Sequence, residues 1–327
     1  MPEQRVTPTS ITTPASAGRR TAMVTVCICT HGRPDYLRNC LDSLRWQTVD
    51  SESFEVVVVD SNSPAEAAAE IRRLVRGLSR AVLVRVDRPG LSHARNAGAA
   101  AARGDYIAYI DDDALAAPDW IERIQQAVGE GHRRPAVLSG RILPVWEAPL
   151  PGWWPASLRG VLSIEEWQGR GEYRTPAVPR HLEPYGVNFI VEREALLAVD
   201  GFEERLGRHA GLLLSDEEVH LAWRLQDRGR SVYYDSRIAV YHCIQAQRLS
   251  PAWLLQRLYW QAGSSVMTHR LLGRDRLVWR TMPRRLLLAI LLRPMGVVPL
   301  ASTRFLGLRW RLAYARGFVR MALGRGL

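Results

Sequence analysis

The sequence predicts an α/β protein whose mostly parallel, Rossmann-like sheet carries helices on both faces. Apolar runs and amphipathic helical patterns alternate four times before the first acidic cluster, as they do in successive βαβ units. Two of the apolar runs end at an aspartate, and ligand sites form at the carboxyl edge of such a sheet. The last part of the chain is basic and partly apolar, and it predicts a helical appendage.

The expected elements follow one another at short intervals. Strands are predicted over 23–29, 56–59, 82–86 and 106–110, and helices over 34–44, 65–76 and 92–103. Pro34 opens the first helix, and Ser92 is the expected cap of the third. Later we expect a strand over 186–191, a helix over 216–227 and two short strands over 231–234 and 238–241. No regular element is predicted over 143–184, where prolines and tryptophans are interleaved.

Three consecutive carboxylates, Asp111, Asp112 and Asp113, follow the fourth predicted strand. Like charges this close disfavour joint ionisation unless a cation neutralises them. Mg²⁺ or Mn²⁺, held by one or two carboxylates and completed by water and substrate phosphates, meets that need. A solvated turn before the next helix is the other interpretation. Because Asp60 ends the second strand, it falls at the same sheet edge, where we expect a nucleotide site.

The formal net charge of +11 is concentrated at one end of the 327-residue chain. Residues 270–327 hold 13 arginines and one acid, a balance of +12, which leaves −1 for the rest. The main domain is therefore nearly neutral, and no nucleic-acid partner is expected. Four cysteines are too few for a disulfide framework in a chain of this length, so they fit a reducing compartment.

The composition divides the chain into three parts. Residues 1–20, rich in Pro, Thr and Ser, predict a disordered lead-in and not a secretory signal. Residues 21–245 form the predicted main domain, and residues 246–327 form a basic, partly apolar helical segment. Its apolar stretch 286–300 is too short to span a membrane. Two interpretations stay open: an interfacial segment lying on anionic headgroups, or a helical hairpin packed on the main domain.

Four blocks of sequence occur in an order typical of one enzyme family. They are VTVCICTHGRPDYLRNCLDSL, VVVVDSNSP, RPGLSHARNAGAAAARGDYIAYIDDDA and LLLSDEEVHLAWRLQDRG. Together they resemble the family 2 glycosyltransferases of bacterial type, and the resemblance covers about residues 22–245. It implies the GT-A fold, and it implies a glycosyltransferase of hexosyltransferase type that binds a nucleotide-sugar donor.

The resemblance also assigns the nucleotide pocket. Thr30, His31 and Arg33, at the end of the first strand, match positions that line the nucleobase pocket. Asp60 matches the acid that contacts the base, and Arg95 matches a residue near the base and phosphates. Because the sequence has neither a GxGxxG loop nor a Walker lysine, phosphate recognition falls to the metal and to arginine.

The acidic run resembles the DxD motif of the family. Asp111 and Asp113 match its outer acids, which contact ribose and metal respectively, and Asp112 is grouped with the nucleotide-sugar-binding residues. His242 stands at a strand end where similar enzymes place a metal-ligating histidine. The implied metal ligands are thus Asp113 and His242, and the implied ion is Mg²⁺ or Mn²⁺.

The resemblance assigns two further motifs, one beside the donor sugar and one that supplies the general base. Gly186 and Asn188 match a turn and strand that lie beside the donor sugar. Asp216, Glu217 and Glu218 stand where the family usually has Gly-Glu-Asp. The resemblance therefore makes Glu218 the general base, with Glu217 as the alternative if the register is shifted by one.

The implied reaction is an inverting transfer from a nucleoside diphosphate, with UDP expected, to an acceptor hydroxyl in cell-envelope polysaccharide or glycolipid synthesis. We expect a cytoplasmic enzyme, and on the interfacial interpretation of its C-terminal segment it lies in peripheral contact with the inner face of the cell membrane. The acceptor is then lipid-linked, and tryptophans of 143–184, such as Trp153 and Trp154, contact it. A nucleotidyltransferase and a non-catalytic sugar-nucleotide-binding module are the alternatives. Glycoside hydrolysis ranks below transfer, since it needs a paired acid and base or nucleophile.

Overall fold

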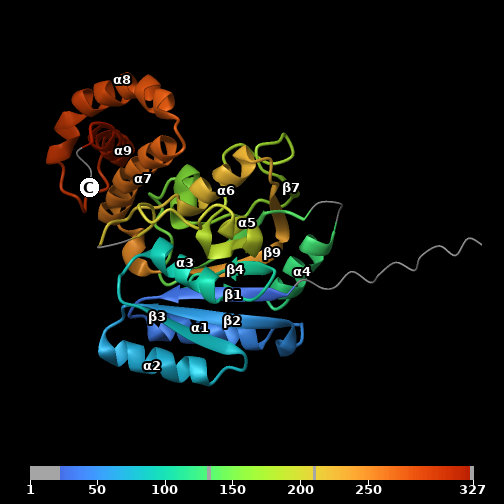
Figure 1. The fold of residues 1–327 in the computed structure, drawn as a ribbon. Helices are drawn as coiled ribbons and strands as arrows, with labels where there is room; N and C mark the ends of the chain where they lie inside the picture. Colours follow the sequence, from blue (N-terminus) through green and yellow to red (C-terminus); the bar gives the residue numbers. More distant parts are fainter. Residues whose placement is uncertain (1–22, 131–133, 209–210, 325–327) are drawn as a thin grey trace, which may run out of the picture.

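The computed structural model describes residues 23–130, 134–208 and 211–324, so the lead-in predicted over 1–20 lies outside the described residues. One nine-stranded sheet runs through this part of the chain in the order β3-β2-β1-β4-β8-β6-β9-β5, with β7 paired to β9 (Figure 1). The strands are β1 (Val24–Thr30), β2 (Phe54–Ser61), β3 (Ala81–Val86), β4 (Tyr106–Tyr109), β5 (Ala114–Ala116), β6 (Val137–Trp146), β7 (Arg170–Glu172), β8 (Phe189–Glu192) and β9 (Val232–Ile244). The α-helices are α1 (Pro34–Arg45), α2 (Ala65–Arg76), α3 (Leu91–Ala101), α4 (Trp120–Gly129), α5 (Arg193–Leu197), α6 (Glu217–Asp227), α7 (Pro251–Leu271), α8 (Asp275–Leu291) and α9 (Leu306–Ala322).

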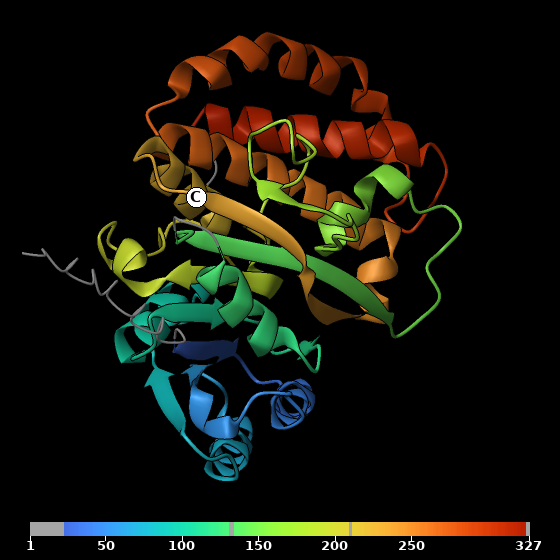
Figure 2. The same ribbon diagram turned by 90° about the vertical axis from the view of Figure 1, so that its right-hand side faces the viewer.

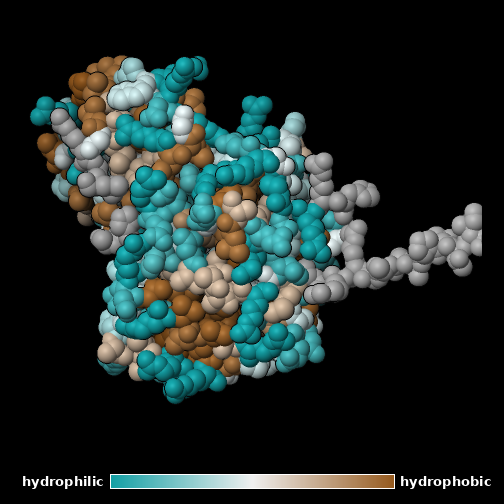
Figure 3. Space-filling model, in the orientation of Figure 1, coloured by the Kyte–Doolittle hydropathy of each residue, from teal (hydrophilic) through white to brown (hydrophobic). Residues whose placement is uncertain are grey.

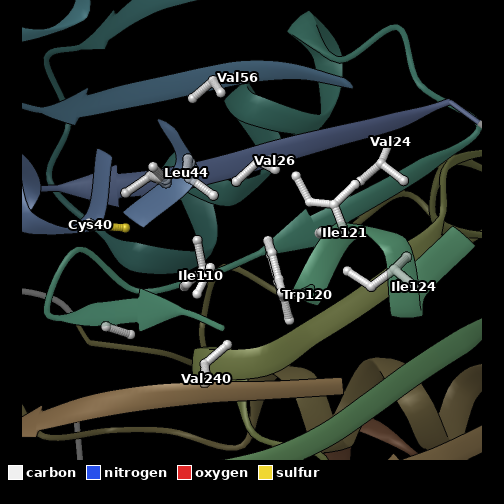
Figure 4. Close-up of a cluster of buried hydrophobic side chains, with 14 of the residues drawn as sticks. Val24, Val26, Cys40, Leu44, Val56, Ile110, Trp120, Ile121, Ile124 and Val240 are labelled. Carbon is white, nitrogen blue, oxygen red and sulfur yellow. The ribbon is translucent and has the colours of Figure 1, made fainter. Parts of the chain in front are cut away.

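The first four strands confirm the predicted parallel sheet with helices on both faces. β1 pairs in parallel with β2 and β4, and β2 pairs in parallel with β3. Val24 and Val26 of β1 pack in one apolar cluster with α1, α2 and α4 (Figure 4). Cys27, on the opposite face of the strand, packs in a second cluster with α3, α5 and α6. The alternation along β1 follows from the two-residue period of a strand.

Beyond β4 the sheet is mixed. β8 runs antiparallel to both β4 and β6, whereas β6 runs parallel to β9. The two short strands predicted near the end are one strand of 13 residues, β9. The register between β6 and β9 shifts after Ser139, and a Cβ at Gly140 would lie 1.9 Å from the carbonyl oxygen of Ile238. Gly140 therefore lets the two strands stay together across a bulge.

Strand pairing collects the predicted site residues at one edge of the sheet. Thr30 lies opposite Asp60 where β1 and β2 end, and β4 ends just before Asp111. β5 pairs antiparallel with β9 so that Ala114 lies opposite His242. The acidic run and the histidine, far apart in sequence, are neighbours for this reason.

The third helix begins differently from the prediction. Gly90, with φ of 152°, precedes its first turn, and Ser92 lies inside the helix instead of capping it. The Ser92 hydroxyl donates to the carbonyl oxygen of Leu206, 2.8 Å away. This bond ties α3 to the loop before α6.

The C-terminal helices α7, α8 and α9 form a layer of their own against the sheet domain (Figures 1 and 2). α9 lies so close to α7 that a Cβ at Gly317 would approach the carbonyl oxygen of Tyr259 to 2.0 Å. α8 buries Val278 and Met282 but exposes most of its other apolar side chains. Within the described residues, no helix has both the length and the apolar character needed to cross a membrane.

Candidate active site

Two cavities lie next to each other at the carboxyl edge of the sheet. The first, of about 440 Å³, is lined by the loops after β1 and β2 and by the start of α3. The second, of about 410 Å³, is lined by α6, α7 and the segment before β8. Leu91, Asp111 and Arg208 line both cavities. A larger cavity, of about 750 Å³, lies between α4 and β7 and contains none of the predicted site residues.

The loop after β1 brings Thr30, His31 and Arg33 to the wall of the first cavity. Nδ1 of His31 lies 2.6 Å from the carbonyl oxygen of Ser61 in the neighbouring loop. The Thr30 hydroxyl donates to Asp112 over 2.7 Å, and the Arg33 guanidinium forms an ion pair with the same carboxylate. All three residues line the cavity, and two of them also hold the acidic run in place.

The acids of the run have different surroundings. The side chain of Asp111 is 29% exposed, whereas those of Asp112 and Asp113 are buried. Burial raises the pKa of Asp112 to about 7, with Arg33 opposing the rise and Asp113 adding to it. Burial also acts to raise the pKa of Asp113, but His242 and neighbouring arginines outweigh it and hold that pKa well below its usual range. Of the two buried carboxyl groups, Asp113 therefore stays ionised to the lower pH.

His242 and Asp113 are the two residues that fit a divalent cation. Nε2 of His242 lies 3.5 Å from Oδ1 of Asp113, and this oxygen is buried without a hydrogen-bond partner. The other oxygen, Oδ2, accepts from Gln245 over 2.7 Å and from Arg248 over 2.9 Å. Arg248 also lies 3.3 Å from Nε2 of His242, so it would release that nitrogen when a metal binds.

The described residues contain no group of three or more His, Cys, Asp or Glu side chains arranged to hold a metal ion. Mg²⁺ and Mn²⁺ sites of nucleotide enzymes need no such group, because water and substrate phosphates supply most ligands. One imidazole nitrogen beside one unpartnered carboxylate oxygen fits a site of that kind. Asp113 and His242 as metal ligands therefore stay a prediction that the chemistry of the pair allows.

Asp60 lies behind the wall of the first cavity. Its Oδ1 accepts from the backbone N–H of Ser63 over 3.0 Å, and its Oδ2 lies 2.5 Å from Nη1 of Arg85. The next two residues, Ser61 and Asn62, line the cavity in its place. The carboxylate shapes the loop, and its predicted contact with the base would require a change in these hydrogen bonds.

Arg95 lines the second cavity and also faces Asp111, which lines both cavities. Its Nη1 donates to Glu217 over 2.9 Å and to Glu218 over 2.7 Å, and its Nη2 lies 3.5 Å from Asp111. The arginine comes from α3 and the two glutamates from the first turn of α6. Burial, then repulsion from Glu218, raises the pKa of Glu217 to about 8, and Arg95 opposes the rise. Glu218 is the more exposed of the two side chains, at 11% against 3%.

The departure from the usual acidic motif has a backbone explanation. Asp216 precedes α6 with φ of 73° and ψ of 11°, a left-handed conformation that glycine adopts without strain and that aspartate tolerates. Its place in the motif is therefore a turn position, and Glu217 and Glu218 start the helix behind it. Gly186 closes the other side, since a Cβ there would lie 1.9 Å from Oε1 of Glu218.

The comparisons with known proteins now decide the family. The model of glycosyl transferase family 2 matches residues 25–142, which include the first four strands and the acidic run. The chain belongs to the family 2 glycosyltransferases. A glucosyl-dolichyl phosphate glucuronosyltransferase of Haloferax volcanii is 28% identical over 245 residues, 74% of this chain and 75% of that protein. The succinoglycan biosynthesis protein ExoM of Rhizobium meliloti is 24% identical over 243 residues, 73% of this chain and 72% of that protein.

A solved structure confirms the predicted GT-A fold of this glycosyltransferase. The mannosyltransferase PcManGT from Pyrobaculum calidifontis, in complex with GDP-Man and Mn²⁺, superposes with a TM-score of 0.56 at 20% identity. The match covers 93% of this chain and 76% of that one. The shared architecture reaches into the C-terminal helices, since the matched share exceeds the sheet domain alone.

Asn188 is placed differently from its predicted position beside the donor sugar. Its amide nitrogen donates to the carbonyl oxygens of Arg141 and Ile238, each at 3.0 Å, and its oxygen accepts from the indole of Trp120. The side chain is fully buried and lines neither cavity of the glycosyltransferase site. Asn188 joins β6, β9 and α4, and its hydrogen-bonding capacity is used there.

The Trp-rich segment lines the second cavity of the glycosyltransferase, but with other residues than predicted. Trp153 and Trp154 stack on each other at 5.4 Å between ring centroids. They pack in an apolar cluster with Leu254 and Leu258 of α7, and neither ring lines the cavity. The segment contributes Ser157, Gly160, Val161, Ser163, His181, Glu183 and Pro184 instead. The tryptophans therefore fasten this loop to α7.

Sequence reasoning missed four polar residues of the glycosyltransferase site. Gln245 and Arg248 bind the predicted metal ligand Asp113, and Arg208 and Arg257 line the second cavity. The position of Gln245 and Arg248 shortly after His242 was an available signal, because residues that follow a site strand often remain near its end. The other two lie on a loop and on α7, and no motif marks them.

Proposed function

We propose that the protein is an inverting, metal-dependent glycosyltransferase that moves a sugar from a nucleoside diphosphate to an acceptor hydroxyl. The observation that carries the proposal is the position of Asp111. It lines both cavities, with the acidic run and His31 on one side and the Arg95–Glu218 pair on the other. The first cavity then takes the nucleotide and the second takes the acceptor, and the sugar is transferred where the two meet.

Each residue has a definite task in this proposal. Thr30, His31 and Arg33 bind the base side of the donor, and Asp111 binds its ribose. Asp113 and His242 would hold Mg²⁺ or Mn²⁺, and the ion would supply Lewis-acid stabilisation of the charge on the diphosphate leaving group. The fold neighbour PcManGT was solved with Mn²⁺ and GDP-Man, which supports a metal and a sugar nucleotide as the ligands of this protein.

Glu218 is the proposed general base. It lines the second cavity and is more exposed than Glu217, so it can accept the proton of an acceptor hydroxyl bound there. The oxygen then attacks the anomeric carbon on the side opposite the leaving nucleoside diphosphate, so the configuration inverts and no covalent intermediate forms. Gly186 leaves room for this approach because any side chain at that position would collide with Glu218.

The donor is proposed to be a UDP-sugar, and a binding screen tests this. Thermal unfolding is followed with a panel of uridine and guanosine diphosphate sugars, each with and without Mn²⁺ or Mg²⁺. A true donor at about 100 times its dissociation constant adds roughly 2.7 kcal/mol to the free energy of unfolding. Stabilisation by guanosine diphosphate sugars alone would show that the donor carries GDP and not UDP. The absence of stabilisation by any sugar nucleotide would overturn the proposed function.

We also propose that the enzyme works at the cytoplasmic face of an anionic membrane, on a lipid-linked acceptor in envelope polysaccharide or glycolipid synthesis. Within residues 286–300, six large apolar side chains are exposed to solvent: Leu286, Leu287, Ile290, Leu291, Val297 and Leu300. Figure 3 shows apolar surface at the upper left, where Figure 1 places α8. Arginines flank these residues, a combination typical of interfacial segments on anionic headgroups. The name of the Haloferax volcanii relative, which includes a dolichyl phosphate, supports a lipid-linked acceptor.

A further inference from the structure

The second cavity contains two arginines that the proposed reaction does not use. Arg208, in the loop before α6, is exposed and lines both cavities, whereas Arg257 of α7 lines only the second. The third arginine there, Arg95, contacts three carboxylates. No carboxylate of the described residues lies within ion-pairing distance of Arg208 or Arg257.

Arg257 keeps a cation in a poorly solvated position. Its Nη1 is buried and has no hydrogen-bond partner among the described residues. Burial, then repulsion from Arg208, lowers the pKa of Arg257 to about 10, while Asp216 and Glu217 oppose the change. A buried donor without an acceptor is destabilising, so a group that accepts from this guanidinium would be bound favourably.

Asp216 and Glu217, the two acids whose charges act most strongly on Arg257, are already hydrogen-bonded to other residues. Oδ1 of Asp216 accepts from the Ser215 hydroxyl over 2.8 Å and from the Gln261 amide over 2.7 Å. Oε1 of Glu217 accepts from Arg95 over 2.9 Å. Neither acid forms an ion pair with Arg257, so its N–H groups remain for a ligand in the cavity.

We propose that Arg257, assisted by Arg208, binds a phosphate group of the acceptor. The inference rests on the proposed function, which assigns the donor diphosphate to the first cavity beside Asp113. Because Arg257 does not line that cavity, its ligand is a second anion. A guanidinium matches phosphate with two parallel hydrogen bonds. Arg208 lies between the two anionic groups, since it lines both cavities.

The position of this subsite restricts the acceptor further. Arg257 and Glu218 line the same cavity of about 410 Å³, so the phosphate and the accepting hydroxyl belong to one small headgroup. A phosphorylated sugar carries a phosphate and hydroxyl groups in one small headgroup, whether its phosphate is free or esterified to a lipid. The acceptor class is therefore a glycosyl phosphate, and an uncharged glycan would leave Arg257 unpartnered.

The test measures phosphate binding while the donor site is filled. Full-length protein is saturated with Mn²⁺ and the nucleoside diphosphate found in the donor screen, and geranyl phosphate, inorganic phosphate and uncharged geraniol are titrated by calorimetry. Geranyl phosphate should bind the unmodified protein at least about tenfold more tightly than geraniol, as expected for hydrogen bonds to a charged group. Inorganic phosphate separates the sources: binding as tight as that of geranyl phosphate shows that the subsite needs no lipid.

Variants assign the effect to the arginine. Arg257→Gln should weaken geranyl phosphate binding roughly tenfold to a hundredfold, Arg257→Lys should weaken it less, and Gln256→Ala, an exposed neighbour on α7, should leave it unchanged. Nucleoside diphosphate affinity should stay the same in all three, which also shows that they are folded. Equal binding of geranyl phosphate and geraniol by the unmodified protein, or undiminished binding by Arg257→Gln, would overturn the inference. Failure of the nucleoside diphosphate itself to bind would instead overturn the proposed function.

Discussion

Nη1 of Arg95 lies 2.7 Å from Oε1 of Glu218, although 123 residues separate them in the sequence. The same nitrogen holds Glu217, and the other terminal nitrogen faces Asp111 on the donor side. One guanidinium thus fixes the proposed base relative to the proposed ribose ligand. The contact also holds the Glu218 side chain in place at the wall of the second cavity.

Glu218→Gln should leave donor binding intact and lower turnover by roughly 10² to 10⁴, the range expected for loss of general base catalysis. The amide still accepts a hydrogen bond from Arg95 but cannot take a proton from the acceptor. Nucleotide affinity and kcat, measured on the same preparation, separate binding from chemistry. Glu217→Gln is the matched control. If Glu217→Gln shows the larger loss in kcat, the general base is Glu217, and the alignment of Glu218 with the base of the family motif is wrong by one residue.

Asp113→Asn should abolish metal-dependent turnover while the protein remains folded. The amide oxygen has no formal charge with which to hold Mg²⁺ or Mn²⁺ beside His242. Turnover is measured across a metal titration, with thermal unfolding as the check on folding. Asp87→Asn, at a side chain 96% exposed, serves as the control and should behave like the unmodified protein. Normal rate and metal response in Asp113→Asn would exclude Asp113 as the main ligand.

The stability of the protein should fall as pH rises through the titration of Glu217. Its pKa is raised from 4.5 to about 8 by burial and by Glu218, so the folded state binds the proton more tightly than the unfolded chain. The stability that this proton contributes is complete below pH 4.5 and is lost as pH rises through about 8. Thermal unfolding across this range should show a steeper decline than in Glu217→Gln. Parallel curves for the two proteins would contradict the assignment.

Trp154→Ala should reduce stability by about 3 kcal/mol, because it empties space in the apolar cluster between the loop and α7. Trp46→Ala, at a ring 78% exposed, should change stability by no more than about 0.5 kcal/mol.

Neither Trp153 nor Trp154 lines the second cavity, so Trp153→Ala should not raise the KM of the acceptor more than that of the donor. A selective rise in the KM of the acceptor would instead support the contact between these tryptophans and the acceptor that the sequence predicts.

Full-length protein should float with anionic vesicles at low salt. Replacing Leu287, Ile290 and Leu291 by serine removes exposed apolar area without changing charge, and should abolish flotation. The matched control replaces Trp46, Val82 and Leu197, exposed apolar residues of the sheet domain, by serine. That variant should float as the unmodified protein does. Sedimentation of the unmodified protein at every salt concentration would make a soluble acceptor the better proposal.

The sequence predicts those parts of the site that follow from local pattern. The first four strands end where their apolar runs end, so Thr30 and Asp111 could be placed at one edge without a structure. His242 could be added because it follows a strand-forming run. These residues are set by strand geometry, which acts over a few residues and is visible in the sequence.

The missed features depend on packing between distant segments. Asn188 satisfies backbone groups of β6 and β9, and nothing in its neighbourhood indicates those partners. Arg257 reaches the cavity because α7 packs across it, and the helix alone gives no sign of this. The single strand β9 needs a bulge opposite Gly140, and a pattern read along one strand cannot show what its neighbour does.

Tyr314 of α9 lines the second cavity, while every residue that lines the first lies before Leu214. The two cavities are therefore completed at different times as the chain is synthesised. The first cavity takes its lining residues from the chain up to Leu213, whereas the second also needs α9, which docks on α7 at Gly317. Loss of α9 would therefore remove lining from the second cavity while leaving every lining residue of the first cavity in the chain.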